Sequence, residues 1–526
     1  MPVVSPEEGL KVGPQVYGAL RRLKPRFRRF AYYAILVFCG ISALRLTIQE
    51  GAGLFSLEES GYGDSYVFHT VQQYLKTGQI YPDLHSRDEL PSLYSPLLYI
   101  MFSIPLRVDA WGSSYVGPRL MVLASFLTCL GLVASISRKL IHCRAAAPLS
   151  ILLACSFGAF EGWPSQLRGD FPSSCFALLA VRLLLEDSPW CYALAGAAAG
   201  FALQFKLTYV VAGTAGFLWL SYQRKWKSLI AFSAMAVLTS LGIYILMLFR
   251  EPYMLEHILA LRSTVPNYPG VARFLYHLGM EPILLLAVTT LPMLVFRQRF
   301  QWSLLALYFL ISFAVSALLS IQAGGNTNYF FEPLFAAAPF AVAGVFWLRE
   351  QTSGMSSVFV ALLICGLGIN PALLSTVKAI RLAKGAAARN RYLENLRQEF
   401  AGKSVFSTVG WASHLTENVA ISEPFLLSYL ERTGKWDSAP WVAKIHQQRF
   451  DLVVADLPRD VYRGVPRISP KIRAAIEEAY EPFSACPGIL LFHRRGENLD
   501  SAMLARFAAM GCHAVACPDA TECRDW

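Results

Sequence analysis

Long apolar runs recur along almost the whole chain, and this feature constrains the fold more than any other. Two of the runs, 190–203 and 207–222, are short, flank Phe205-Lys206, and are expected to meet near one face of a membrane. Nine others have about the 17–25 residues with which a helix crosses a bilayer. They cover residues 30–48, 119–137, 146–161, 170–186, 228–249, 280–296, 301–320, 329–348 and 354–376. Charged residues make up only 16% of the chain, against about 25% in soluble proteins. We therefore predict a polytopic α-helical membrane protein with about 11 transmembrane helices.

The placement of the cations predicts how this bundle is oriented. The formal net charge is +11, and a cluster of basic residues stands directly before the first apolar run, where the positive-inside rule puts cations in a membrane protein. The cluster consists of Arg21, Arg22, Lys24, Arg26, Arg28 and Arg29. The basic balance is therefore a matter of topology, which predicts a cytoplasmic N-terminus over residues 1–29 and argues against nucleic acid as a partner.

Alternating sides from that start makes basic residues much sparser per residue in the outer connections than in the cytoplasmic ones. Of the cytoplasmic connections, only Glu186-Asp187 lacks a cation. The apolar segment Tyr94–Leu106 is short and carries two prolines. Counting it as a span would move every later connection to the other side and break the positive-inside rule. We therefore predict a juxtamembrane helix for Tyr94–Leu106.

Three domains follow from this reading. They are the N-terminus 1–29, a transmembrane domain 30–382 with a long outer loop 49–118, and an extracytoplasmic α/β domain 383–526 that ends in an extension. Alternating strands and helices predict the last of these. The expected elements are strands at Lys403–Val409, Phe450–Ala455 and Ile489–His493 and a helix at Ser469–Tyr480. One or two disulfides are expected there if the domain lies in an oxidising compartment, formed among Cys486, Cys512, Cys517 and Cys523.

Asp64 is the first candidate for chemistry. It follows Gly63 in the outer loop, and helical spacing of apolar residues begins directly after it. It is expected to stand at the N-cap of that helix. One interpretation is that Asp64 only caps the helix; the other is that it acts as a general base. The neighbouring Glu58 and Glu59 are expected to be solvated or to face lipid headgroups. A divalent cation held by these carboxylates stays an alternative, and no cofactor is assigned.

Two cations near the outer ends of spans are candidates for binding an anion. Lys206 stands between two short spans, where a cation either snorkels to the interface or meets an anion such as a lipid phosphate. Arg168 precedes Asp170 and Pro172 at the opening of the fourth span. That pattern is also an ordinary helix start.

The turn before the tenth span is unusually polar. It contains Asn326, Asn328, Tyr329 and Glu332, and a polar N-cap explains one of these residues but not all of them. Glu332 is expected at the edge of the hydrocarbon, where an ionisable group indicates a functional site by default. The signatures of soluble hydrolases, nucleotide-binding proteins and zinc proteases are missing from the sequence.

The order of these motifs resembles a known family. They are Asp64-Ser65, Gly78-Gln79-Ile80-Tyr81-Pro82-Asp83, the segment Pro91–Tyr99 that contains Tyr94, Arg168-Gly169-Asp170, Lys206-Leu207-Thr208 and the turn Gly324–Glu332. The series resembles the bacterial integral-membrane glycosyltransferases of the GT-C superfamily, in particular the protein O-mannosyltransferase-like and aminoarabinose-transferase-like branch. The resemblance covers most of residues 30–480. Ser65 stands where many members have a second acid, and Gly169 replaces a usual proline.

The resemblance implies an enzyme of the bacterial cytoplasmic membrane. It would transfer a sugar from a polyprenyl-phosphate donor to a glycan, lipid or protein acceptor at the outer face. Asp64 would take the proton of the attacking acceptor hydroxyl. Lys206, with Arg168 or an arginine of the loop 250–279, would stabilise the departing lipid phosphate. Further substrate contacts are expected from Tyr94, Asn326, Asn328, Tyr329 and Glu332.

Two other classes of protein stay open at this point. A lipid or glycan transporter needs a polar path through the bilayer, often with broken helices at the midplane, whereas here the polar residues gather at one face. A non-catalytic assembly or sensor protein would work through its C-terminal domain and would not need the first outer loop.

Overall fold

The computed structural model describes residues 14–57, 59, 63–83, 92, 94–108, 114–260, 272, 275–276, 278, 281–296, 300–321, 326–350, 377, 380–381, 383–416, 418–421, 426–456, 461–462, 465–466 and 468–515. The predicted span 354–376, the cysteines Cys517 and Cys523 and the predicted C-terminal extension beyond residue 515 lie outside the described residues.

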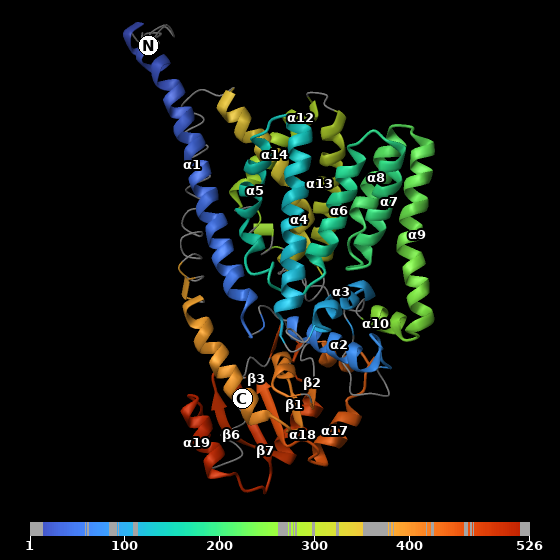
Figure 1. The fold of residues 1–526 in the computed structure, drawn as a ribbon, viewed down its shortest axis with the longest axis vertical. Coiled ribbons are helices and arrows are strands. Elements are labelled where there is room, and N and C mark those ends of the chain that lie inside the picture. Colours follow the sequence, from blue (N-terminus) through green and yellow to red (C-terminus); the bar gives the residue numbers. More distant parts are fainter. Residues whose placement is uncertain are drawn as a thin grey trace, which may run out of the picture.

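A bundle of apolar helices occupies one half of the molecule, and a sheet-containing C-terminal region lies beyond one end of it (Figure 1). Each predicted span before 354–376 overlaps a bundle helix. These helices are α1 (Pro14–Leu54), α4 (Val116–Ile141), α5 (Ala146–Cys155), α6 (Asp170–Leu184), α7 (Pro189–Leu203), α8 (Val211–Tyr222), α9 (Trp226–Arg250), α12 (Pro282–Phe296), α13 (Phe300–Leu319) and α14 (Phe331–Glu350). Five segments, in α1, α4, α9, α13 and α14, are long and apolar enough to cross a bilayer. The chain is therefore a multi-pass membrane protein.

The predicted span 146–161 is too long. Helix α5 ends at Cys155 and is followed by the short 3-10 helix η2 (Gly158–Phe160). With 10 residues, α5 is only about 15 Å long. The apolar residues after it serve the bundle core instead, because the Phe160 ring packs against Phe171 at 6.1 Å and Phe335 at 4.7 Å. Apolar composition alone does not distinguish a helix that continues from a turn that is buried in the core.

Two ion pairs lie at the end of the bundle away from the C-terminal region. They join connections that the charge pattern predicts to lie on the same side of the membrane. Lys139 binds Glu186 at 3.0 Å, and Lys225 binds Asp187 at 2.5 Å. The cations that the connection Glu186-Asp187 lacks in sequence are thus supplied by its neighbours in space. The three connections after α4, α6 and α8 therefore lie together, as alternation of sides requires. We call this end the distal end of the bundle and the other the proximal end.

A layer of short helices separates the bundle from the C-terminal region (Figure 1). It contains α2 (Asp64–Thr77), α3 (Pro96–Leu106) and α10 (Met254–Ala260). Helix α3 is the predicted juxtamembrane segment. It has 11 residues, so it is about 16 Å long and cannot cross the hydrocarbon core of about 30 Å. Figure 1 places it at the proximal end, beside α2.

The C-terminal region is built around a mixed six-stranded sheet with the order β2-β1-β3-β7-β6-β8. Strand β1 pairs in parallel with β2 and β3, and the remaining pairs are antiparallel. The strands are β1 (Val405–Ser407), β2 (Val419–Ile421), β3 (Leu452–Asp456), β6 (Tyr480–Cys486), β7 (Ile489–Arg494) and β8 (His513–Ala514), with a separate pair β4 (Val461–Tyr462) and β5 (Val465–Pro466). The three strands expected from sequence are β1, β3 and β7.

Helices cover both faces of this sheet. They are η5 (Gly410–His414), α16 (Leu426–Arg432), α17 (Ala439–His446), α18 (Pro470–Ala479) and α19 (Ser501–Ala509), together with a helix over residues 383–400. Helix α18 is the one expected from sequence, and Ser469 caps it through a hydrogen bond from the Ile472 N–H. Alternate residues of the central strands serve two cores, so that Phe492 belongs to one and Leu491 to the other. This alternation is the period-two pattern of a sheet covered on both sides.

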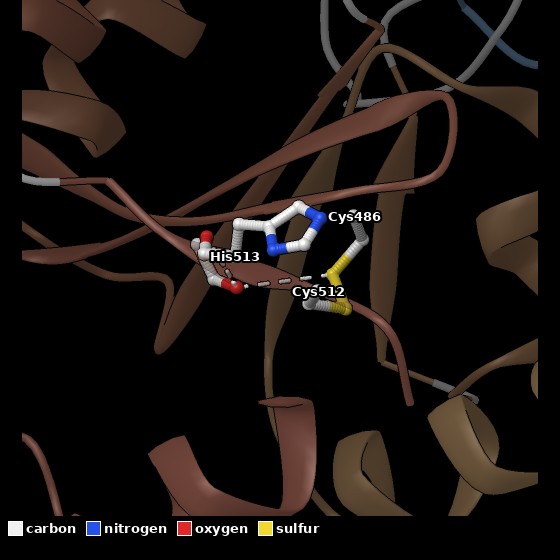
Figure 2. Close-up of a disulfide and its surroundings, with 4 residues drawn as sticks. Cys486, Cys512 and His513 are labelled. Atoms are coloured by element: carbon white, nitrogen blue, oxygen red, sulfur yellow. Dashed lines mark hydrogen bonds between the residues drawn. A yellow bond between two sulfur atoms is a disulfide. The ribbon is translucent and has the colours of Figure 1, made fainter. Parts of the chain in front are cut away.

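A disulfide joins Cys486, at the end of β6, to Cys512, next to β8 (Figure 2). It fixes α19 and the last strand to the sheet. The free energy of unfolding gained by closing a loop of this size is typically about 2–4 kcal/mol. The sequence predicts one or two disulfides among four cysteines, and this pair is one of them.

Candidate active site

Three segments that are far apart in sequence bring charged and polar side chains together at the proximal end of the bundle. Asp170 is the first residue of α6, Lys206 follows α7, and Asn328 belongs to the 3-10 helix η4 (Thr327–Phe330) before α14. The Lys206 Nζ lies 2.6 Å from the Asp170 Oδ1. The Asn328 amide donates to both carboxylate oxygens of Asp170, at 3.0 and 3.1 Å. Asp170 therefore begins α6, as its sequence context indicates, and is also the centre of this cluster.

Tyr329 completes the surroundings of Lys206. The Lys206 ammonium lies 4.5 Å from the centre of the Tyr329 ring, in the geometry of a cation–π contact. The Lys206 side chain is only 11% exposed. Lys206 therefore meets an anion within the protein rather than snorkelling into solvent.

Gly169 allows this arrangement. A Cβ atom at position 169 would lie 2.5 Å from the carbonyl oxygen of Phe205, which is closer than real side chains approach a backbone oxygen. The chain that carries Lys206 thus packs directly onto the start of α6. The glycine that departs from the family pattern has a local steric reason here.

Arg168 lies beside this cluster and connects it to Tyr94. Its Nη1 donates to the Tyr94 hydroxyl at 3.3 Å, and its Nε donates to the Gln166 side chain at 3.1 Å. Burial by itself lowers the pKa of the Arg168 guanidinium, but Tyr94, Asp64 and Asp170 outweigh it and raise that pKa above its usual value. Arg168 is therefore a permanent cation between two carboxylates. Burial raises the pKa of Tyr94, so its hydroxyl stays protonated.

Asp64 does not stand at an N-cap, so that expectation is wrong by one position. Gly63 is the N-cap, with φ 102°, and Asp64 is the first residue of α2. Its carboxylate is fully buried. Oδ1 accepts a hydrogen bond from the Leu167 N–H at 3.1 Å. Oδ2 lies 4.0 Å from the Arg119 Nη2. Glycine takes the positive φ of this position readily, and the helix begins one residue earlier than the pattern indicates.

Arg119 is a site neighbour that the sequence reasoning missed. It is fully buried near the start of α4 and donates to the carbonyl oxygens of Gly53, at 2.7 Å, and Ser56. It thereby ties the end of α1 to α4 next to Asp64. A signal was present, because a lone arginine within an apolar span start is itself a site indicator.

Glu59 is not the solvated residue that we expected. It is half-buried, and the Ser65 hydroxyl donates to it at 2.5 Å. Ser65 holds the position where many GT-C members have a second acid, and here it brings a carboxylate from six residues earlier toward Asp64. Glu58 lies outside the described residues, as do Arg262 and Arg273 of the loop 250–279.

The other predicted site residues differ in how closely they approach the cluster. Glu332 is buried, accepts a hydrogen bond from the Tyr308 hydroxyl at 2.8 Å, and lies within electrostatic reach of Lys206. Asn326 instead caps η4, since its side chain accepts the Thr327 N–H at 2.8 Å. Among the described residues, no group of three or more histidines, cysteines or carboxylates is placed to hold a metal ion.

Two buried side chains after α9 hold the outer loop that carries Tyr94. Glu251 accepts the backbone N–H groups of Ile80, at 3.0 Å, and Tyr81, at 3.1 Å. His257 accepts the Ser92 N–H at its Nδ1, at 2.9 Å. Its Nε2 must then carry the proton and donate to the Pro82 oxygen at 2.6 Å. The Tyr81 hydroxyl in turn donates to the Tyr94 backbone oxygen at 2.6 Å.

His257 predicts a loss of stability in acid. Burial lowers its pKa from 6.5 to about 4, so the folded protein favours the neutral ring. This contribution is complete above pH 6.5 and is lost as the pH falls toward 4, and a difference of this size corresponds to about 3 kcal/mol. We expect the thermal unfolding temperature of the wild type to fall more between pH 7 and pH 4.5 than that of His257→Gln. Equal slopes would show that the ring does not hold the loop.

Comparison with solved structures gives the fold a precedent. The chain superposes on ArnT from Cupriavidus metallidurans bound to undecaprenyl phosphate with a TM-score of 0.57 and 12% identity, covering 88% of this chain and 97% of that one. The same protein in its apo state gives a TM-score of 0.56 at 11% identity, with the same coverage. No protein-family model and no curated protein matches the sequence. The fold expected from the motif order is thereby confirmed, because the chain shares the fold of these two ArnT structures.

Proposed function

We propose that the chain is a glycosyltransferase of the bacterial cytoplasmic membrane that uses a polyprenyl-phosphate-linked sugar as its donor. One observation carries the proposal. Two partly buried cations lie beside Tyr94 at the proximal end of the bundle: Arg168 donates to the Tyr94 hydroxyl, and Lys206 acts on it electrostatically. A lipid-phosphate donor keeps its tail in the bilayer and its phosphate at the interface, which the proposal puts at this end of the bundle. The fold agrees, since ArnT has been solved with undecaprenyl phosphate bound.

In this proposal Arg168 and Lys206 bind the donor phosphate. The acceptor oxygen attacks the anomeric carbon, the bond between that carbon and the phosphate oxygen breaks, and its electron pair stays on the phosphate. The two cations stabilise the charge that develops on this leaving group. Asp170 and the Tyr329 ring hold the Lys206 ammonium in place. Asn328, Glu332 and Asn326 support the same wall of the site.

Asp64 is the proposed general base, taking the proton of the acceptor hydroxyl as it attacks with inversion. It is the first residue of α2 and lies within electrostatic reach of Arg168. Its carboxylate is fully buried, so the proposal requires a local rearrangement around Asp64 when an acceptor binds. The C-terminal region and the proximal end then lie outside the cytoplasm, in agreement with the disulfide between Cys486 and Cys512.

Measuring the lipid-linked sugars of the cell tests this function. In cells that lack the protein, the polyprenyl-phosphate sugar is expected to accumulate while one glycan, lipid or protein loses that sugar. Purified protein in liposomes that contain the extracted donor and acceptor should restore the transfer. A transporter would instead move the intact donor between leaflets and release no polyprenyl phosphate. That outcome would reject the transferase.

A further inference from the structure

A cavity of about 560 Å³ lies between α2 and the C-terminal region. Its size falls within the usual range of pockets for small ligands, about 300–1,000 Å³. Three segments form its walls: the second half of α2, the end of the helix over residues 383–400, and the stretch from η5 into β2. It lies along α2 away from the Asp64 end and contains none of the proposed donor-binding residues.

The walls of this cavity are polar and basic. Lys76 and Arg397 line it together with two histidines, His69 and His414. The amides Gln72, Gln73 and Asn418 lie between them, and none of the described lining residues is acidic. Lys76 acts electrostatically on His69, and burial lowers the pKa of His69 to about 4. The His69 ring is therefore neutral, able to donate one hydrogen bond and accept another.

A buried hydroxyl gives a second, independent indication of a ligand. Ser413 lines the cavity and is 7% exposed. Its Oγ has no hydrogen-bond partner among the described residues. A buried hydroxyl without a partner costs folding free energy, and such a group needs an explanation. The Oγ is buried beside the cavity rather than open to it, so a rotation of the Ser413 side chain onto a hydroxyl or phosphate oxygen of a bound ligand provides one.

Packing connects the cavity to the proposed site of transfer. Asp64 begins α2, and His69 and Lys76 follow at about 8 and 18 Å along its axis. The His414 ring stacks on Phe68 at 4.6 Å and meets the Tyr115 ring edge-on at 4.0 Å. The Arg119 guanidinium also lies over the Tyr115 ring, 4.6 Å from its centre. One aromatic wall thus separates the cavity from the Asp64–Arg119 pair.

We propose that this cavity binds an anionic saccharide, namely the charged part of the acceptor. Lys76 and Arg397 pair with its phosphate or carboxylate, and the amides, Ser413 and His69 bind its hydroxyl groups. A saccharide seated there lies across the aromatic wall from Asp64, so its free hydroxyl reaches that carboxylate only with the local rearrangement that the buried Asp64 already requires. That the bound saccharide is the acceptor rests on the proposed function, whereas its binding in the cavity does not.

Direct binding tests the inference without a donor. The purified protein in detergent is titrated by calorimetry with three probes: a neutral disaccharide, its monophosphate, and a disaccharide that contains a uronic acid. The two anionic probes are expected to bind at least about tenfold more tightly than the neutral one, which corresponds to about 1.4 kcal/mol. Which of them binds more tightly distinguishes phosphate from carboxylate. Equal binding of all three, or no binding, would overturn the proposal.

Variants locate the binding. Lys76→Gln and Arg397→Gln are each expected to weaken the anionic probes about fivefold to tenfold and to leave the neutral probe unchanged. Both side chains are exposed, so the unfolding temperature should stay the same. Lys435→Gln, an exposed lysine elsewhere on the C-terminal region, is the matched control and should bind like the wild type. Unchanged affinity in Lys76→Gln and Arg397→Gln would place the binding outside this cavity.

The same variants separate the two proposals. If the transferase proposal holds, Lys76→Gln raises the KM for an anionic acceptor and leaves the KM for the lipid donor unchanged. A second outcome is that no sugar transfer is detected, while the anionic probes still bind and the variants lower their affinity. The saccharide site then stands, and the transferase proposal is rejected. If every variant transfers sugar with the wild-type KM for the acceptor, the transferase proposal stands and the cavity is not its acceptor site.

Discussion

The exchange Asp64→Asn is expected to reduce sugar transfer by about 10²–10⁴-fold, the range that a general base contributes. Asparagine keeps the shape of the side chain and an oxygen that can accept the Leu167 N–H. It cannot take a proton from the acceptor. The measurement is turnover in liposomes with the donor and the acceptor saturating, so that a change in affinity does not hide a change in rate. Transfer at the wild-type rate would rule out Asp64 as the base.

A structural role for Asp64 needs a separate control, because the same exchange leaves the buried Arg119 without a carboxylate 4.0 Å away. The double variant Asp64→Asn/Arg119→Gln removes both charges and keeps an amide that can donate to Gly53 and Ser56. If Asp64 only balances Arg119, the double variant recovers both unfolding temperature and transfer. If Asp64 is the base, stability recovers and transfer does not.

Lys206→Gln is expected to have the second large effect, on stability and on catalysis together. It removes the cation that lies 2.6 Å from the buried Asp170 carboxylate, and breaking such a pair on one side costs about 3–5 kcal/mol. Loss of a group that stabilises the departing phosphate reduces turnover by about 10²–10³-fold. The unfolding temperature and the rate of transfer measure the two effects independently.

A matched pair at the distal end supplies the control for Lys206. Lys225 lies 2.5 Å from Asp187 and 5.2 Å from the centre of the Tyr192 ring, so it reproduces the local geometry away from the proposed site. Lys225→Gln is expected to change neither turnover nor donor KM, and its exposed pair contributes little to stability.

The double variant Lys206→Gln/Asp170→Asn is expected to regain stability but not transfer, because charge balance returns while the phosphate ligand does not. Recovery of transfer as well would show that Lys206 serves only as the partner of Asp170.

Most of the fold follows from patterns within single segments. The apolar runs before residue 350 correctly predict the bundle helices that the structure describes, since the cost of leaving backbone groups unpaired in lipid forces such runs into helices. The short, proline-containing run correctly predicts α3. The errors occur where a segment's partner decides its role. The run 146–161 breaks after Cys155 because Phe160 is needed in the core, and Glu59 turns inward because Ser65 donates to it.

The sequence by itself determined that this is a multi-pass helical membrane protein and which segments carry its polar residues, because hydrophobicity and charge act through the position of each residue in its own segment. It did not determine which of these residues meet. Asp170, Lys206 and Asn328 come from three connections, and only the packing of α6, α7 and η4 joins them. Likewise, the cavity behind α2 exists only because the C-terminal region docks against it. Contacts between distant segments depend on how side-chain shapes fit together in three dimensions, and no local pattern in the chain records that fit.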